Sequence, residues 1–479
     1  MKTRFIAVLL GICLSGAPAG GDGPRAQRAG MLIVVPRAMA GALDRFIEHK
    51  RKSLDARLVA LEEVLAHHAG ADDAERLKRH LYDAWRERGV RYVLLVGDAD
   101  VMPVRYMVLD RVTEPAFDYA FYPSDLYYAD VARADGSFDD WNAQREGFHA
   151  GYYGEVRGEK NKRDPINYDQ VDYRPELALG RWPVSTPEEA AIVAAKTIRY
   201  ETGLGPARGR ETPTAALVAV GGWIDSRGHM DRVAARLEAR WRVERLYHAD
   251  AGRNDGTPPP TEPELLRVMN GGARLVLHAG HGHDDGWEHC LSVGSLGGLR
   301  NEESLPVIFS VGCSTARLAT LPPYEAYVDA NGVEHAGTNS GQVFTVPPPA
   351  PACYQKGRFN PTGLGEQMLR AGTVGVVAYI GCNTGSQPCA LTLLEGFVES
   401  AGRRERPRVG DCWADAVAYY FERERLATIA PTESWYPASI FFQGMKFMLF
   451  GDPSLALAGS GEAGEGGAAS QPASERPAR

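Results

Sequence analysis

Two apolar, strand-like runs each end in a residue that can take part in catalysis. Residues 273–279 lead through a glycine to His281, and residues 305–311 lead through a glycine to Cys313. Ligands and reacting groups in an α/β sheet lie beyond the carboxyl ends of the strands. If these two strands are neighbours, an imidazole and a thiol meet at one sheet edge, which is the geometry that a thiol nucleophile needs beside its proton donor.

The local surroundings of both residues favour a site over a core position. Glycines flank His281 and allow close approach of the backbone to a substrate. Ser314 and Thr315 begin a turn after Cys313, where exposed backbone N–H groups can stabilise a thiolate and bind an oxyanion. A histidine at a strand end and an apolar-flanked cysteine are each commonly structural, so the pair is more informative than either residue alone.

A zinc site competes for the same stretch of chain. Three histidines and a cysteine join His281 within thirteen positions: His278, His283, His289 and Cys290. Histidine and cysteine suit Zn²⁺, but the spacing matches neither paired cysteines nor the helical His-Glu-x-x-His pattern. On a strand, His278 and His281 point to opposite faces, so a thiol–imidazole pair is the favoured interpretation.

An acidic stretch nearer the N-terminus predicts a structural calcium site. Its candidate ligands are Asp125, Asp130, Asp135 and Asp139, and Ca²⁺ takes several oxygen ligands from flexible loops. The spacing is not that of an EF-hand, and a solvated acidic loop is the alternative. No cofactor is expected to be required for the chemistry.

Composition restricts the class of protein. The chain has 479 residues, of which 44% are hydrophobic, and a formal net charge of −8. This length suits two or three domains with sizeable cores. This net negative charge does not indicate the basic surface that nucleic-acid binding requires, so no nucleic-acid partner is expected.

The N-terminus predicts export. Residues 1–19 combine a charged start, an apolar stretch and small residues for cleavage, as in a secretory signal peptide. No later segment has the roughly 20 apolar residues of a spanning helix, so we expect an extracellular, periplasmic or cell-surface protein. Six cysteines follow the signal, and an exported protein can carry disulfides.

Two α/β blocks follow the signal. Alternating strand and helix patterns predict a supporting subdomain at 30–204 and a second subdomain at 213–458, each doubly wound with a mainly parallel sheet flanked by helices. A Pro-rich insertion at 321–361 interrupts the second block, and residues 459–479 have the composition of a disordered tail.

The chain resembles the gingipain-type cysteine peptidases, peptidase family C25, which share the caspase-like fold. The resemblance extends over nearly the whole chain after the signal. The matching stretches, in order, are residues 92–98, 124–125, 176–181, 279–287, 311–313 and 450–455.

This resemblance implies that Cys313 is the nucleophile and His281 the general acid/base. It also implies an oxyanion hole formed by the backbone N–H groups of Gly282 and Cys313. Both subdomains would be caspase-like, with the second carrying the site. Family members cleave peptide bonds after basic residues, and several bind calcium.

The sequence departs from the family pattern around the site. Residues 221–223, Gly-Gly-Trp, stand where arginine-specific members carry a glutamate that assists the histidine. Asp225 and Asp231 are the candidate acids of a pocket for a basic side chain, and Trp287 is a further candidate pocket residue. The insertion, with Lys356 and Arg358, is a candidate to cover the cleft.

The sequence therefore predicts a secreted cysteine endopeptidase that acts on proteins or peptides, with a preference for basic residues as a secondary expectation. Two alternatives stay open: a catalytically silent surface homologue with a binding or assembly role, and a ligase that transfers the acyl group of the same thioester to an amine. No feature of the sequence indicates an oligomeric state.

Overall fold

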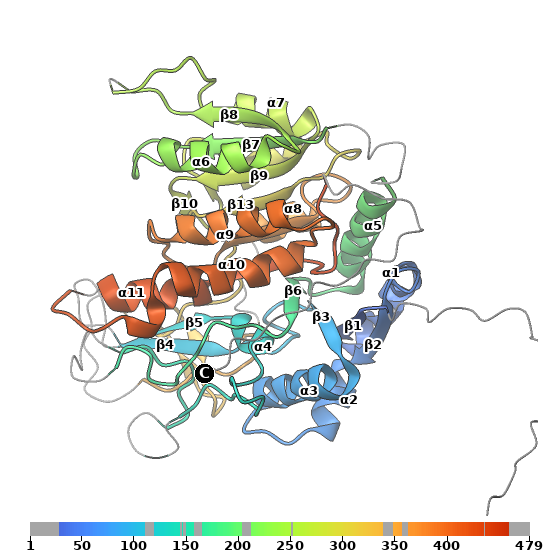
Figure 1. The fold of residues 1–479 in the computed structure, drawn as a ribbon. Coiled ribbons are helices and arrows are strands. Elements are labelled where there is room, and N and C mark those ends of the chain that lie inside the picture. The colour runs from blue at the N-terminus through green and yellow to red at the C-terminus, as the bar shows by residue number, and fades with distance from the viewer. Residues whose placement is uncertain are drawn as a thin grey trace, which may run out of the picture.

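The computed structural model describes residues 28–458, apart from 111–118, 144–145, 147–149, 158–164, 204–211, 251, 339–347, 357–362 and 435. Its centre is a ten-stranded sheet with the strand order β2-β1-β3-β6-β17-β16-β13-β9-β7-β8. Helices cover both faces of this sheet (Figure 1). The expected α/β class with mainly parallel pairing is confirmed.

The N-terminal half of the sheet consists of four parallel strands. These are β1 (Gly30–Val35), β2 (Asp55–Ala60), β3 (Val90–Val96) and β6 (Ala178–Trp182). The helices of this half are α1 (Asp44–Lys50), α2 (Leu61–His67), α3 (Asp73–Arg88), α4 (Leu126–Ala129) and α5 (Pro187–Gly203). Every residue of β1 and β6 is buried, as expected for parallel strands covered on both faces.

The C-terminal half contributes the other six strands. They are β7 (Thr214–Ala219), β8 (Arg242–Tyr247), β9 (Ala273–Ala279), β13 (Val307–Ser310), β16 (Ala378–Cys382) and β17 (Phe447–Gly451). Its helices are α6 (Arg227–Leu237), α7 (Glu262–Asn270), α8 (Leu364–Arg370), α9 (Ala390–Arg403), α10 (Val409–Arg423) and α11 (Tyr436–Gln443). Helices α3, α6, α9 and α10 pack on one face, and α1, α5, α7 and α8 on the other.

The two halves share one sheet, where we had expected each to have its own. Strand β17 runs antiparallel to β16 and pairs on its other side with β6, through Phe450 and Arg181. Strand β17, the last strand of the described residues, thus joins the edges of the two halves. This strand was missed in the sequence because its short apolar run follows directly on helical segments.

Local features of the sequence explain where helix α5 and strand β16 begin. Thr186 accepts a hydrogen bond from the Glu189 N–H (3.2 Å) at the start of α5, as its capping pattern predicts. The sequence pattern predicts a strand at 373–379, but the strand begins later, at Ala378, because Gly372 and Gly375 adopt positive φ values of 51° and 96°. A Cβ at Gly375 would clash with the Met368 carbonyl oxygen, so only glycine fits this turn.

The Pro-rich insertion packs on the N-terminal half. The Phe121 N–H, on β5 (Tyr119–Pro123), donates to the Pro322 carbonyl (2.8 Å), and the Tyr152 hydroxyl donates to that of Pro348 (2.7 Å). Its Gln355 N–H donates to the Ala99 carbonyl (3.0 Å). Lys356 is exposed, and Arg358 lies outside the described residues. The expected role in covering the cleft stays a prediction.

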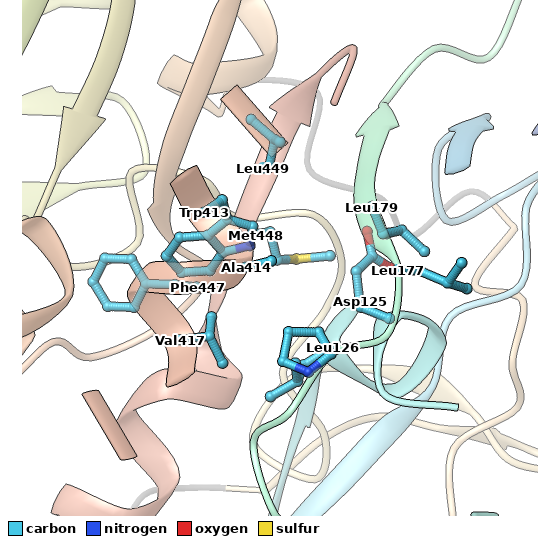
Figure 2. Close-up of a pocket in the computed structure, with 12 residues that line it drawn as sticks. Asp125, Leu126, Leu177, Leu179, Trp413, Ala414, Val417, Phe447, Met448 and Leu449 are labelled. Atoms are coloured by element: carbon cyan, nitrogen blue, oxygen red, sulfur yellow. The ribbon is translucent and has the colours of Figure 1, made fainter. Parts of the chain in front are cut away.

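A small apolar cavity lies where α4 and β6 face α10 and β17 (Figure 2). Its volume of about 20 Å³ is enough for little more than one water molecule. It therefore marks imperfect packing between the two halves and is too small for a ligand.

The six cysteines after the predicted signal are all free thiols. The predicted signal and tail lie outside the described residues. Among the helices of the described part of the chain, none is long and apolar enough to cross a membrane.

Candidate active site

Strands β9 and β13 are adjacent and parallel, and their register aligns His281 with Cys313. His278 pairs with Ser310, and each candidate catalytic residue lies three positions beyond its member of that pair. The loops touch directly: a Cβ at Gly312 would lie 3.0 Å from the Cα of Gly282. Both candidates therefore lie at one sheet edge, with backbone packed on backbone between their loops.

The His281 imidazole is held by a backbone carbonyl. Its Nε2 lies 3.0 Å from the carbonyl oxygen of Gly222, in the loop that follows β7. Gly222 has φ of 90°, a left-handed conformation that favours glycine. An N–H at Nε2 donating to this oxygen fixes the orientation of the ring and leaves Nδ1 for a second partner. The Gly221–Trp223 stretch, noted above for its missing glutamate, thus still supplies an acceptor.

Cys313 lies in a turn whose backbone is tied to the loop after β16. Its side chain is half-buried, and the Ser386 N–H donates to its sulfur over 3.2 Å. Ser314 has an uncommon positive φ of 56°, and its N–H donates to the Thr384 carbonyl (2.8 Å). Among the described residues, no acceptor is hydrogen-bonded to the Cys313 N–H.

A buried polar layer supports the two loops from below. His278 is fully buried, its Nδ1 lies 2.9 Å from the Ser310 hydroxyl, and its ring stacks on Trp287 with centroids 4.1 Å apart. Burial lowers the pKa of His278 to about 3, so its imidazole is neutral. The Ser310 hydroxyl accepts the Gly312 N–H (3.2 Å), one residue before Cys313.

Trp287 lies in this supporting layer, although the sequence suggested a pocket residue. It is 2% exposed, and its indole N–H donates to the Tyr379 hydroxyl (3.0 Å). Its flat face is occupied by His278. Trp287 therefore holds the loop of His281 from inside.

The two candidate pocket acids are paired with arginines of the chain. Asp225 receives two bonds from the Arg227 guanidinium, at 2.8 and 3.0 Å. Asp231 is bonded by Arg253 (2.7 Å) and by the Tyr247 hydroxyl (3.2 Å). In this arrangement, a substrate's basic side chain would have to displace an internal arginine from either carboxylate.

The four candidate calcium ligands are not brought together. Asp125 forms a buried, bidentate pair with Arg181 (2.7 and 2.8 Å), and Asp135 bonds the Ser137 hydroxyl. Asp130 is fully buried, and Asp139 accepts the Trp141 N–H (3.1 Å). In the part of the chain that the structure describes, no three His, Cys, Asp or Glu side chains group to hold a metal ion. The calcium site therefore stays a prediction from sequence.

The residues of the competing zinc hypothesis are likewise dispersed. His278 is in the core, while His283 and His289 are exposed. Burial raises the pKa of Cys290 to about 12, which disfavours the thiolate that zinc requires.

Ser386 is a site residue that the sequence analysis missed. It lies in the polar stretch Asn383–Gln387, directly after the buried strand β16. Because β16 pairs in parallel with β13, the stretch reaches the same edge as Cys313. A polar run after a third strand was the available signal, but the strand predicted at 373–379 ends before β16 does, at Cys382.

The comparison with known families gives the class of protein, a cysteine peptidase. The model of peptidase family C25 matches residues 25–458. The match covers nearly the whole chain, which belongs to this family.

Solved structures show the same fold. The Arg-specific cysteine proteinase gingipain R has a TM-score of 0.55 and 16% identity, with 90% of this chain and 79% of that chain covered. A complex of the pro- and mature domains of the Porphyromonas gingivalis enzyme gives 0.56 and 16%, with 90% and 80% covered. A structure described only as a protease gives 0.56 and 15%, with 90% and 78% covered. A search of curated proteins found no match.

Proposed function

We propose that this cysteine peptidase is an endopeptidase that uses Cys313 as nucleophile and His281 as general acid/base. The observation that carries the proposal is their register: each lies three residues beyond the His278–Ser310 pair on adjacent parallel strands. The backbone contact between Gly282 and Gly312 supports it, since it holds the two loops at a fixed separation.

The reaction proceeds through a thioester. The Cys313 proton passes to His281, and the thiolate sulfur attacks the scissile carbonyl carbon to form a tetrahedral oxyanion. His281 returns the proton to the leaving nitrogen as the C–N bond breaks, which releases the amine. Water then attacks the thioester, with His281 as base, and the acid product leaves as the Cys313 sulfur is regenerated.

Backbone N–H groups are suited to hold the oxyanion. The Gly282 and Cys313 amides belong to the two loops in contact, and the Cys313 N–H has no acceptor among the described residues. Preorganised donors of this kind stabilise charge that develops only in the transition state.

The Gly222 carbonyl takes the place of an assisting carboxylate. Its oxygen, 3.0 Å from Nε2, fixes the ring and favours the imidazolium that forms as Cys313 loses its proton. A carbonyl carries a partial charge only, so this support is weaker than that of a carboxylate.

A preference for basic residues is supported by the likeness to an Arg-specific proteinase. The pairing of Asp225 with Arg227 and of Asp231 with Arg253 does not favour it. Matched peptides that differ only in Arg, Lys or Leu before the scissile bond test it. Equal kcat/KM values for the three would remove the basic preference and leave the peptidase intact.

Export is proposed from the signal-like residues 1–19. Expression of the full chain in a bacterial host with a secretion pathway tests it. The processed N-terminus should lie near residue 20 in the exported fraction, and an intact Met1 in a purely internal product would contradict export.

Turnover of an unstructured protein substrate tests the chemistry. Wild type should release new amino termini, whereas Cys313→Ala and His281→Ala should each lose activity by about a thousandfold or more while retaining the native melting transition. Retained turnover in folded Cys313→Ala would refute the assignment. Ligated products on addition of an amine would favour acyl transfer over hydrolysis.

A further inference from the structure

Among the described residues, those of the loop after β16 make the closest hydrogen-bond contact to the Cys313 sulfur. The Ser386 N–H points at Sγ over 3.2 Å, and the Ser386 carbonyl lies 3.8 Å from the same atom. The Thr384 carbonyl accepts the Ser314 N–H (2.8 Å), directly after the nucleophile. The loop therefore contacts the turn that carries Cys313 at two points, the Cys313 sulfur and the Ser314 backbone N–H.

Two buried polar side chains, from the end of α11 and the short segment before β17, form hydrogen bonds to this loop. Gln443, the last residue of α11, accepts the Gln387 N–H at Oε1 (3.1 Å) and donates from Nε2 to the Ser386 hydroxyl (3.3 Å). Lys446 donates from Nζ to the Gly385 carbonyl (3.1 Å). Gln443 is fully buried and Lys446 is 4% exposed, so solvent does not compete for these bonds.

The same loop is anchored to the N-terminal half. Asn383 donates from Nδ2 to the Pro123 carbonyl (2.5 Å) at the end of β5. The Lys446 ammonium lies 5.6 Å from the centroid of the Tyr122 ring on the same strand. Burial of a lysine ammonium is costly unless it is compensated, and the Gly385 carbonyl and the Tyr122 ring supply part of that compensation.

We propose that Gln443 and Lys446 are positioning residues that fix residues 384–387 so that the Ser386 N–H donates to the Cys313 sulfur and stabilises its thiolate. The bond favours ionised sulfur because a thiolate is a stronger hydrogen-bond acceptor than a thiol. The proton lost from Sγ goes to solvent or to His281. The proposal deepens the proposed function, on which its catalytic relevance rests, but thiolate formation can be measured without substrate.

Alkylation of Cys313 by iodoacetamide measures thiolate availability directly, because the thiolate is the reacting species. Rates are followed from pH 5 to 10, with the modified cysteine located by mass spectrometry. Lys446→Met and Gln443→Met each remove the side-chain bonds at similar size. Each variant should slow alkylation of Cys313 at pH 7 about threefold to tenfold. The pH at which the alkylation rate reaches half its maximum should rise by about half a unit to one unit.

Two further variants separate positioning from general destabilisation. Lys446→Arg keeps a buried cation with donors and should restore much of the rate. Lys196→Met removes another buried lysine, whose Nζ bonds the Met368, Leu369 and Val374 carbonyls. It should lower the melting temperature without moving the midpoint. An unchanged midpoint in folded Lys446→Met and Gln443→Met, or an equal shift in Lys196→Met, would overturn the proposal.

Hydrogen exchange tests the bond from the Ser386 N–H to the Cys313 sulfur without altering Gln443 or Lys446. Cys313→Ala removes the sulfur acceptor, so deuterium uptake in a peptide spanning 384–387 should rise relative to wild type. Unchanged uptake would show that the Ser386 N–H is not bonded to sulfur. Neither experiment depends on hydrolysis: a shifted midpoint in a protein with no peptidase activity would retain this inference and refute the proposed function.

Discussion

Cys313 and His281 owe their placement to backbone atoms of several other segments. The sulfur accepts the Ser386 N–H, and the imidazole lies against the Gly222 carbonyl. Only a glycine at 282 permits the contact between the two loops, because an added Cβ would lie 2.6 Å from Thr315 Cγ2 and 2.8 Å from the Cys313 oxygen. At this scale, small steric changes should affect chemistry strongly.

Gly282→Ala should lower kcat/KM by about 10²–10³-fold, because it displaces one of the two N–H groups proposed for the oxyanion hole. Gly228→Ala is the matched control, since an added Cβ there meets no atom within 4 Å. Peptide hydrolysis by both variants is the measurement. Equal activity in the two variants would contradict the assigned oxyanion donor.

At the scale of elements, buried titratable side chains lie at the same edge of the sheet as the candidate active site, beyond the carboxyl ends of the parallel strands. Asp98 follows β3, and burial raises its pKa to about 7, although the Ala99 N–H bonds one of its oxygens (2.7 Å). Arg370 on α8 lies 3.8 Å away and also bonds Glu366 (3.1 Å). The pKa of Glu366 is raised as well, chiefly by burial. The folded state thus favours protonated carboxyls here.

Asp98→Asn should become more stable relative to wild type as pH rises from about 4 to 7. In that range, the unfolded aspartate ionises while the folded one stays protonated, so wild type loses about 1.4 kcal/mol per pH unit from this group. Above pH 7 both states are ionised, and the difference becomes constant. Urea unfolding of both proteins at pH 5, 6, 7 and 8 measures it. A difference that does not change with pH would show that Asp98 is ionised in the folded protein.

The sequence predicted elements best where local and tertiary signals agree. The Thr186 cap marks the start of α5, and the strand runs before His281 and Cys313 are β9 and β13. Strand β17 and the start of β16 were not predicted, because partner strands and two glycines decide them. The contact of the Gly222 carbonyl was out of reach, since backbone atoms carry no signal in residue type. The polar run at 383–387 indicated a segment at the sheet edge, but not the bond from the Ser386 N–H to the Cys313 sulfur.

At the scale of the whole molecule, the continuous sheet couples the two halves. Lys50 on α1 is buried with Asp452, which follows β17, and with Glu201 of α5 (2.6 Å). Nearby Arg181 of β6, which pairs with β17, bonds Asp125 deep in the N-terminal half. We therefore expect the described halves to unfold as one cooperative unit.

Lys50→Met should lower the free energy of unfolding by about 3–5 kcal/mol, because it leaves the buried Asp452 carboxylate without its cation. Lys52→Met, at an exposed position, should change it by less than about 0.5 kcal/mol. Denaturant unfolding followed by fluorescence and circular dichroism should give coincident transitions for both variants. Two separated transitions in wild type would contradict coupling through the sheet.

The most direct test of the central claim is labelling with peptidyl chloromethyl ketones that carry Arg, Lys or Leu at the reactive end, with mass spectrometry to locate the adduct. We expect an adduct on Cys313, formed much more slowly in His281→Ala, and preserved when each of the other five cysteines after residue 19 is replaced singly by serine. The order of the three probes reports the side-chain preference. A folded, reduced protein that acquires no adduct on Cys313 from any probe would refute Cys313 as the nucleophile.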